Sequence, residues 1–284
     1  MTTNALSQKK KSNTVLIQPS KGWVGLRLRD LWEYRELVYF LTWRDIKVRY
    51  KQSVLGIMWA VINPFMTMVV YTIFFGTLAK IPSDGVPYPI FSYTALLPWI
   101  LFSSALSVAS RSMVSSGNMI SKIYFPRMIV PLASVMSSVV DFFIAFIILI
   151  GMMLFYNITP TIAMLWLPLL ILLALISALG VGFWFSALMV RYRDVGYLMP
   201  FVTELWKFIT PVVYPASMIP EKWRLLYALN PMTGVVEGFR YALLGTSQSL
   251  SLPMMLVSSG IAILVLVSGL FYFRRMEKQF ADMI

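Results

Sequence analysis

The chain has 284 residues, a formal net charge of +12 and neither cysteine nor histidine. Hydrophobic residues make up 58% of it and charged residues only 13%, whereas soluble domains have about 45–50% apolar and about 25% charged residues. The composition therefore indicates an integral membrane protein with room for about six helical spans and little else. The missing residue types exclude disulfides, thiol chemistry and the commonest metal ligand, so we expect no metal site.

The sequence also lacks the motifs of a nucleotide-driven or hydrolytic enzyme. It contains no phosphate-binding loop, no dinucleotide-binding glycine motif and no nucleophile elbow. We therefore expect no catalytic residues and no cofactor bound by this chain. The positive charge could indicate a nucleic-acid partner, but Lys and Arg flank apolar segments, which favours a membrane surface as the partner instead.

Residues 1–25 are polar and basic, with Lys9, Lys10 and Lys11 in succession. Because they lack the apolar core of a secretory signal, we predict a flexible cytoplasmic tail.

Residues 26–51 are predicted to form an interfacial amphipathic helix that lies on the membrane without crossing it. Its apolar and aromatic residues recur at helical spacing and share one face, namely Leu28, Trp32, Tyr39, Trp43, Ile46 and Tyr50. The basic residues Arg44, Lys47 and Arg49 point elsewhere. Aromatic rings beside a basic flank suit the headgroup boundary. An ordinary amphipathic helix packed on a partner protein is the alternative.

Residues 52–284 are predicted to form one all-α domain of six transmembrane helices. The apolar segments that are long enough lie at 54–79, 90–110, 128–156, 164–190, 196–216 and 252–273. Eleven Lys and Arg precede the first segment, and the alternate loops that follow are richer in them than the loops between. This alternation predicts that both termini are cytoplasmic, which requires an even number of spans.

The stretch 217–250 is apolar and helical in pattern but has no segment long enough to span. One short helix is predicted from Glu221 to Leu229, and a second from Asn230 and Pro231, a good start signal, to Gly245, a good stop. We expect both helices to be re-entrant or interfacial on the outer side.

Three charged residues lie within predicted spans, where each charge costs about 2.5–3.5 kcal/mol on insertion scales. Asp141 is in the third span, and Glu204 and Lys207 are in the fifth. Glu204 and Lys207 are three residues apart, so they share a helical face and can pair. They are interpreted either as structural pairing groups or as the lining of a polar conduit.

Aromatic residues number 42, with 19 Phe, 9 Trp and 14 Tyr. Many suit the membrane interface, which is the plain interpretation. Flat rings also suit the apolar faces of sugars, so rings within or near spans are candidates to line a substrate channel. These candidates are Tyr71, Phe74, Phe75, Trp99 and Phe102.

The predicted cytoplasmic loop at 111–127 holds a short amphipathic stretch bounded by Gly117 and Pro126. It is either a plain connection or a docking helix for a cytoplasmic partner. The candidate docking residues are Asn118, Ile120, Lys122, Tyr124 and Arg127, together with Arg191 and Arg193 in the basic turn from Val190 to Gly196.

Several ordered segments resemble a known family. They are LTWRDIKVRYKQSVLGIMWAVINP from Leu41, YFPRMIVPLASV from Tyr124, VRYRDVGYLMPF from Val190 and YALNPMTGVVEGFRYALLG from Tyr227. Together with the six spans and the outer pair of short helices, they resemble the membrane permease of type-two ATP-binding-cassette exporters of bacterial polysaccharides. The resemblance covers about residues 26–280; the basic tail before it has no match.

The resemblance implies a homodimer that works with two copies of a separate ATPase, which binds ATP and Mg²⁺, in the bacterial inner membrane. Two chains would enclose a channel for a lipid-linked polysaccharide such as an O-antigen. The interfacial helix and residues 117–127 would meet the ATPase. The short outer helices would form an external gate, with Trp223, Tyr227, Asn230, Pro231 and Arg240 as its candidate residues.

Other functions stay open on the sequence. The same architecture could export teichoic acid, a glycolipid or a drug. A channel or ion-coupled carrier would use Asp141, Glu204 and Lys207 and would transport without ATP. A purely structural scaffold would tolerate bulky residues in the presumed channel.

Overall fold

The computed structural model describes residues 28–51, 56–246 and 251–280. Over these residues the chain is helical, with turns and short irregular segments between the helices. The predicted tail at 1–25 lies outside the described residues.

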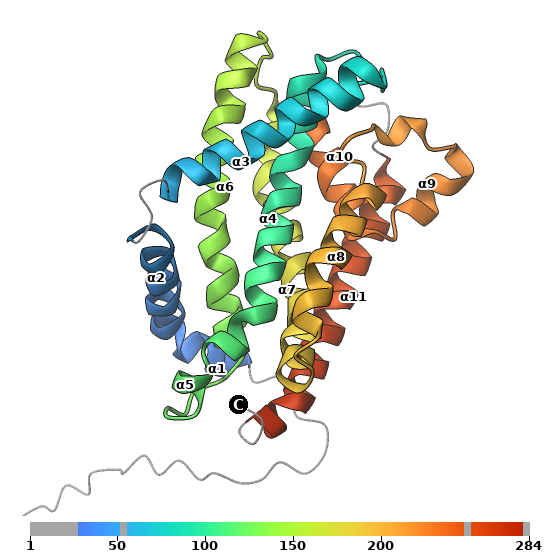
Figure 1. Ribbon diagram of the computed structural model, residues 1–284. Helices are drawn as coiled ribbons and strands as arrows, with labels where there is room; N and C mark the ends of the chain where they lie inside the picture. The colour runs from blue at the N-terminus through green and yellow to red at the C-terminus, as the bar shows by residue number, and fades with distance from the viewer. Residues whose placement is uncertain (1–27, 52–55, 247–250, 281–284) are drawn as a thin grey trace, which may run out of the picture.

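Five helices are long and apolar enough to cross a membrane: Gly56–Leu78, Tyr88–Ser115, Ile129–Phe155, Ile162–Arg191 and Leu252–Met276. In the labels of Figure 1 they are α3 (Gly56–Tyr71) with the π-helical turn Thr72–Leu78, α4 (Tyr88–Ser115), α6 (Ile129–Phe155), α7 (Leu167–Arg191) preceded by the 3-10 turn Ile162–Trp166, and α11 (Leu252–Met276). They correspond to five of the six predicted spans.

The remaining predicted span, 196–216, is shorter in the structure. Helix α8 (Val195–Ile209) has 15 residues, or about 22 Å of helix. Thr210 is extended, with φ −86° and ψ 141°, because the proline that follows it disfavours helical geometry. The sequence prediction therefore placed the end of this helix too far along the chain.

The connections lie at two opposite ends of the molecule (Figure 1). Helix α1 (Leu28–Glu33), helix α5 (Gly117–Ile120), the α7–α8 turn and the end of α11 gather at one end. The α3–α4 and α6–α7 connections and helix α9 (Glu221–Tyr227) lie at the other. This grouping agrees with the two sets of loops that the Lys and Arg counts separate. Which end is cytoplasmic stays a prediction.

Helix α4 is the centre of the bundle and packs against α6 and α7, while α7 packs in turn against α11. The main hydrophobic core surrounds α4, with Phe91, Tyr93 and Phe102 fully buried. A second hydrophobic core lies at the α5 end of the bundle and joins residues far apart in sequence, including Ile120 and Phe280.

The segment predicted as one helix at 26–51 is divided at Tyr34 into α1 and α2 (Arg35–Lys51). Helix α2 packs along α6, where Leu41 is buried and the Thr42 hydroxyl donates a hydrogen bond to the Ala133 carbonyl at 3.2 Å.

The aromatic and basic side chains of this segment are not separated as predicted, because Arg44 and Lys47 line one hollow with Trp43 and the Lys47 ammonium lies 5.4 Å from the Trp43 ring centre. Trp32, Tyr39 and Trp43 are exposed, so these three side chains do lie away from the core. Tyr50 does not share their surface, because its hydroxyl donates a hydrogen bond to Asp141 on α6. An interfacial position for α1 and α2 stays a prediction.

The two short helices near the end of the chain form as α9 and α10 (Pro231–Leu244). The Asn230 side chain caps α10 by accepting a hydrogen bond from the backbone N–H of Met232 at 3.1 Å. Gly245 ends it in the left-handed region, with φ 68°. The predicted start and stop signals of this helix are confirmed.

Helices α7 and α11 approach closely because glycine lies on both sides of their contact. A Cβ at Gly269 would lie 2.2 Å from the carbonyl oxygen of Gly180, and a Cβ at Gly180 would lie 2.6 Å from the backbone nitrogen of Leu266. Small residues at such contacts let two membrane helices pack backbone to backbone.

Gly269→Ala should therefore destabilise the bundle, by about 1–3 kcal/mol as in other overpacked sites. Gly260→Ala on the same helix is the matched control, because a Cβ there meets no atom within 4 Å. Thermal unfolding of the purified protein should show a lower midpoint for Gly269→Ala alone. Equal midpoints would contradict the close contact.

Candidate permeation groove

A polar cavity of about 400 Å³ lies between α3, α4 and α8. Hydroxyl and amide side chains line much of it, namely Asn63, Thr67, Ser103, Ser107 and Thr203. Trp99, Ser103 and Ser107 share one face of α4 because they are spaced four residues apart. This spacing explains how one helix can present a polar stripe to the cavity while its other faces fill the core.

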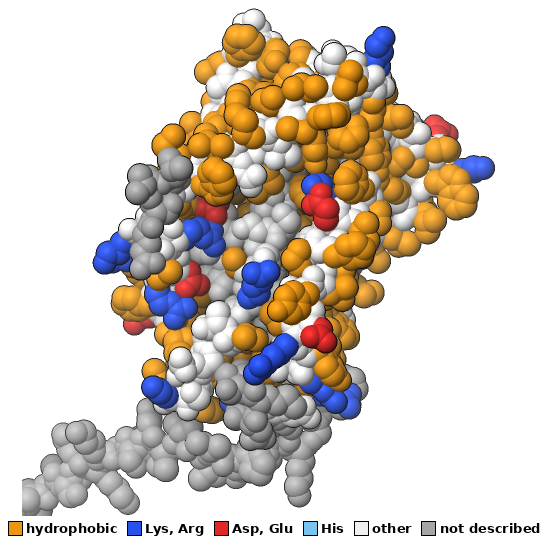
Figure 2. Space-filling view, viewed as in Figure 1, with side chains coloured by type: hydrophobic (Ala, Val, Ile, Leu, Met, Phe, Trp, Pro, Cys, Tyr) orange, Lys and Arg blue, Asp and Glu red, His pale blue; other side chains and the backbone are white. Residues whose placement is uncertain are grey.

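A second cavity of about 460 Å³ adjoins the first, between α2, α3, α4 and α6. The two share Asn63, Ile100 and Ser103, so we treat them as one permeation groove. In the wall of the second cavity, the Ser104 hydroxyl donates a hydrogen bond to the Ser138 hydroxyl at 3.3 Å. Figure 2 shows that hydrophobic side chains cover the upper part of this face of the molecule, while charged side chains gather over its middle and lower parts.

The predicted pairing of Glu204 with Lys207 is present, and both side chains line the groove. Glu204 is 59% exposed and Lys207 17%. The Lys207 ammonium also lies 6.0 Å from the ring centre of Tyr71 and 5.6 Å from that of Phe208. The lysine is therefore held by one carboxylate and by nearby ring faces.

Asp141 has partners on α2, which the sequence analysis did not anticipate. The Asp141 carboxylate pairs with Arg49 and accepts a hydrogen bond from the Tyr50 hydroxyl. Arg49 also donates to the Ser137 hydroxyl at 3.2 Å. Burial and then the Asp141 hydrogen bond raise the pKa of the Tyr50 phenol, so this hydroxyl stays protonated and donates. These contacts fasten the end of α2 to the middle of α6.

The candidate channel aromatics lie in different environments. Trp99 lines the groove. Phe102 is fully buried, with its ring centre 5.4 Å from Trp99 and 5.0 Å from Trp206. Tyr71 is buried, with its ring edge-on to Phe75 at 5.5 Å, and Phe74 is 56% exposed. Only Trp99 of this set lines the groove, because it alone shares a face of α4 with the serines.

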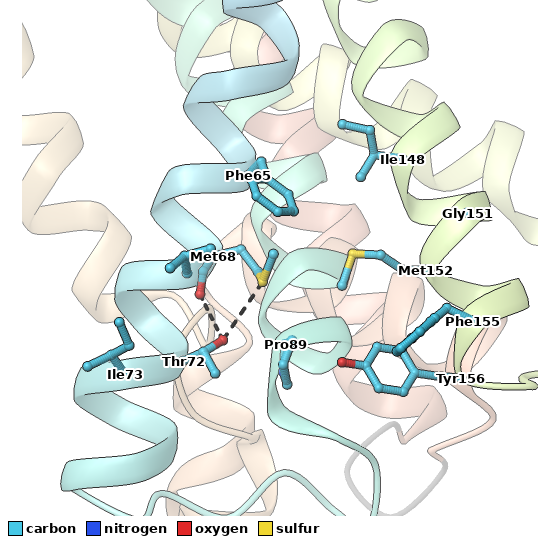
Figure 3. A pocket seen from close by; sticks show the side chains of 11 residues that line it. Phe65, Met68, Thr72, Ile73, Pro89, Ile148, Gly151, Met152, Phe155 and Tyr156 are labelled. Atoms are coloured by element: carbon cyan, nitrogen blue, oxygen red, sulfur yellow. Dashed lines mark hydrogen bonds between the residues drawn. The ribbon is translucent and has the colours of Figure 1, made fainter.

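An apolar cavity of about 550 Å³ lies nearer the opposite end of the bundle, between α3, the start of α4 and the end of α6 (Figure 3). Phe65 and Met68 from α3 face Ile148 and Met152 from α6 across it. The Thr72 hydroxyl is already bonded to the Met68 carbonyl at 2.8 Å. The lining carries no charged side chain, so this cavity suits hydrocarbon and not sugar.

The candidate docking residues lie at the α5 end of the bundle. Asn118, Lys122 and Tyr124 are exposed, with Tyr124 at 82%. Ile120 is buried in the second core, so it holds the loop and does not present a surface. The exposed Arg191 and Arg193, in the turn before α8, lie at the same end of the molecule.

Arg127 is bound within the chain instead of facing outward. Its side chain donates to the Glu277 carbonyl, and its backbone N–H donates to the Glu277 carboxylate at 3.2 Å. Its guanidinium carbon lies 6.0 Å from the ring centre of Phe280. The end of the chain therefore braces the candidate docking loop, a role that spacing along the sequence does not reveal.

The gate candidate Arg240 is buried, at 1% exposure, where the sequence analysis expected a gate residue. It pairs with Glu237 at 2.7 Å and donates to the Val212 carbonyl at 2.9 Å. Its guanidinium also lies 3.7 Å from the ring centre of Phe91. A buried charge needs such partners, so Arg240 anchors the segment after α8 and lines no opening.

The other gate candidates tie α8 to α9 and α10. The Asn230 side chain accepts from the Trp206 indole and donates to the Thr210 hydroxyl, each at 2.9 Å. The Tyr227 hydroxyl donates to the Ile209 carbonyl. Pro231 is buried, and Trp223 is 51% exposed.

Four features were not predicted from the sequence: the serine stripe on α4, the partners of Asp141, and the roles of Glu237 and Glu277. The four-residue spacing of Ser103 and Ser107 was a readable signal. Glu237 and Arg240 are three residues apart on one helix, so their pairing could also have been predicted from the sequence. The other two involve residues separated by more than 90 positions. Among the described residues, no three Asp or Glu side chains gather as a metal site would require.

Comparison with known proteins identifies the family. The ABC-2 type transporter family model matches residues 36–244. The chain is 29% identical over 261 residues to the O-antigen export system permease protein RfbA of Myxococcus xanthus, covering 90% of this chain and 98% of that protein.

A protein of the same name from Klebsiella pneumoniae is 28% identical over 250 residues, covering 88% of this chain and 95% of its own. The polysialic acid transport protein KpsM of Escherichia coli is 23% identical over 209 residues, covering 71% and 78%. The resemblance drawn from the motifs is thus confirmed: this chain belongs to the ABC-2 type transporter family.

Proposed function

We propose that this chain is the transmembrane permease subunit of an ATP-driven exporter that moves a lipid-linked, O-antigen-like polysaccharide across the bacterial inner membrane. The observation that carries the proposal is the permeation groove, where hydroxyl, amide and indole groups gather between apolar helices. Such groups suit sugars, which need hydrogen bonds at their edges and apolar contact on their faces. The relatives named for O-antigen export align over nearly the whole of their length.

A separate ATPase supplies the energy in this proposal. ABC-2 type membrane proteins work with ATP-binding-cassette ATPases, and the sequence here carries no nucleotide-binding motif of its own. Two ATPase copies would bind ATP and Mg²⁺ and act on the exposed residues of the α5 end. ATP can drive export only if it favours one of two arrangements of the permease.

We place two copies of the chain in the complex. The groove is open on one side, as the 59% exposure of Glu204 indicates. A second copy that faces the first would close the groove into a channel, and a C2 pair is the commonest way for identical chains to do so.

Six crossings, with both ends in the cytoplasm, fit the arrangement of the chain best. Five crossings would leave the two ends on opposite sides, but α1 and the end of α11 lie at the same end (Figure 1). Helix α8 runs from that end towards α9 and supplies the sixth crossing. Its 15 residues span less than the roughly 30 Å hydrocarbon core, so the irregular segment 210–214 that follows it would complete the crossing. Helices α9 and α10 would then lie on the outer side as the gate.

A channel or an ion-coupled carrier is the competing function. It would use Asp141, Glu204 and Lys207, but all three are engaged in ion pairs. Export in vesicles decides between the two. The chain reconstituted with a cassette ATPase should move a lipid-linked polysaccharide only when ATP is present, and the chain alone should move none. Transport by the chain alone, without ATP, would contradict the proposal.

Charge reversal at the exposed docking residue should weaken coupling to the ATPase. Lys122→Glu places a carboxylate on an exposed surface, so ATP-driven export should fall about fivefold or more while thermal stability stays unchanged. The measurement is the ratio of glycan exported to ATP hydrolysed. Lys80→Glu is the matched control, because Lys80 is exposed in the α3–α4 connection at the opposite end. If the ratio of glycan exported to ATP hydrolysed is the same in both variants, the α5 end is not the docking surface.

Arg127→Glu should behave differently from Lys122→Glu. It sets a carboxylate against Glu277 and breaks the brace at the chain's end, so both stability and coupling should fall. Glu277→Gln keeps an acceptor for the Arg127 backbone N–H and should cost much less. A loss of coupling in Arg127→Glu with unchanged stability would instead mean that Arg127 contacts the ATPase directly.

Trp99 and Phe102 give a paired test of the groove. Both are large rings on α4, but only Trp99 lines the cavity. Trp99→Leu should lower export about tenfold relative to Phe102→Leu at equal amounts of folded complex, because the groove loses the indole ring that forms part of its wall. If export follows stability equally in both variants, Trp99 is a packing residue only.

A further inference from the structure

The charged side chains that line the permeation groove form two ion pairs. Four charged side chains line it: Arg49 and Asp141 at the α2–α6 side, and Glu204 and Lys207 on α8. Arg49 is paired with Asp141, and Lys207 with Glu204. Each pair brings one positive and one negative charge, so the described lining carries no net charge.

The rest of the lining is neutral as well. Asn63, Thr67, Ser103 and Ser107 present amide and hydroxyl groups, and Trp99 presents an indole. These groups can hydrogen-bond to sugar hydroxyls or stack on a sugar face. None of them can neutralise a carboxylate or a phosphate that repeats along a polymer.

The large positive charge of the chain does not contradict this neutrality. Of the 24 Lys and Arg residues, eleven precede the first span. Others, including Lys122 and Arg191, are exposed at the α5 end of the bundle. Among the described residues, Arg49 and Lys207 are the only Lys and Arg side chains that line the groove, and each is paired with a carboxylate.

We propose that the groove is selective for a polysaccharide whose repeating chain is uncharged, and that the two ion pairs enforce this selection. The inference rests on the proposed export function and names the class of its substrate. A polyanion moving through the groove would lose water without meeting an unpaired cation, because Asp141 and Glu204 already neutralise Arg49 and Lys207. This uncompensated desolvation disfavours a charged chain. A neutral chain does not meet this cost.

The ion pairs also give the selection a specific mechanism that can be altered. Removing the carboxylate of Glu204 leaves Lys207 as an uncompensated cation facing the groove, which is the group that a polyanion needs. Removing both charges restores a neutral lining. Specificity of this kind depends on repulsion of the wrong substrate as much as on attraction of the right one.

The test uses the permease reconstituted in vesicles with its cassette ATPase. Two lipid-linked polysaccharides of similar length serve as substrates: one of neutral hexoses, and one with a uronic acid in every repeat. Wild type should export the neutral polymer at least about tenfold faster. Glu204→Gln should reduce that preference several-fold, and Glu204→Gln combined with Lys207→Gln should restore it. Thermal unfolding of each variant checks that the complex is folded.

The outcomes separate this inference from the proposed function. ATP-dependent export of both polymers at similar rates by wild type would overturn the inference and leave the export function standing. An unchanged preference in Glu204→Gln would overturn the role of the ion pair. Export of neither polymer by wild type would contradict the export function itself, and this inference with it.

Discussion

A charged side chain among apolar helices is stable only if a partner or water compensates it, and the arrangement of this molecule follows from that constraint. Arg240 is fully buried and is compensated by Glu237, by backbone carbonyls and by the face of Phe91. In forming these contacts it fixes the segment that follows α8. Arg49 and Asp141 fasten α2 to α6 in the same way. The ion pair of Arg49 with Asp141 thus joins two helices that surround the groove, while Arg240 holds the segment after α8 in place.

The second hydrophobic core offers a route between the α5 end and the spans. It contains Ile120 beside the candidate docking loop, Phe183 on α7, and Phe273 and Phe280 near the end of the chain. Phe273 lies 5.2 Å from Phe183 and 5.3 Å from Phe280 between ring centres. A movement at α5 would therefore press on α7 and α11 together, whose backbones already touch at Gly180 and Gly269. Packed contacts of this kind transmit displacement because the interior has little free volume.

Much of the fold was predictable because apolar length and helix signals are local properties of the sequence. Five spans and the cap of α10 at Asn230 belong to this class. The early end of α8 was missed because the apolar pattern continues past Ile209, although the geometry changes before the proline. The partners of Tyr50 and Arg127 were not predicted because they are distant in sequence. The burial of Arg240 was not predicted either, although its partner Glu237 is only three positions away. The pairing of Glu204 with Lys207 was predictable because the two residues are three positions apart on one helix.

We place the path of the glycan in the polar groove beside α4. Because the chain has no cysteine, a single introduced thiol reports on its own position. Ser107→Cys lies in the groove, and Leu256→Cys lies on the exposed apolar side of α11. With a water-soluble maleimide, we expect labelling of the Ser107→Cys complex and protection of that thiol while a glycan is held in transit. We expect no labelling of the Leu256→Cys complex. If the Ser107→Cys complex is not labelled, or if the glycan does not change its labelling, the groove is not the path of the glycan.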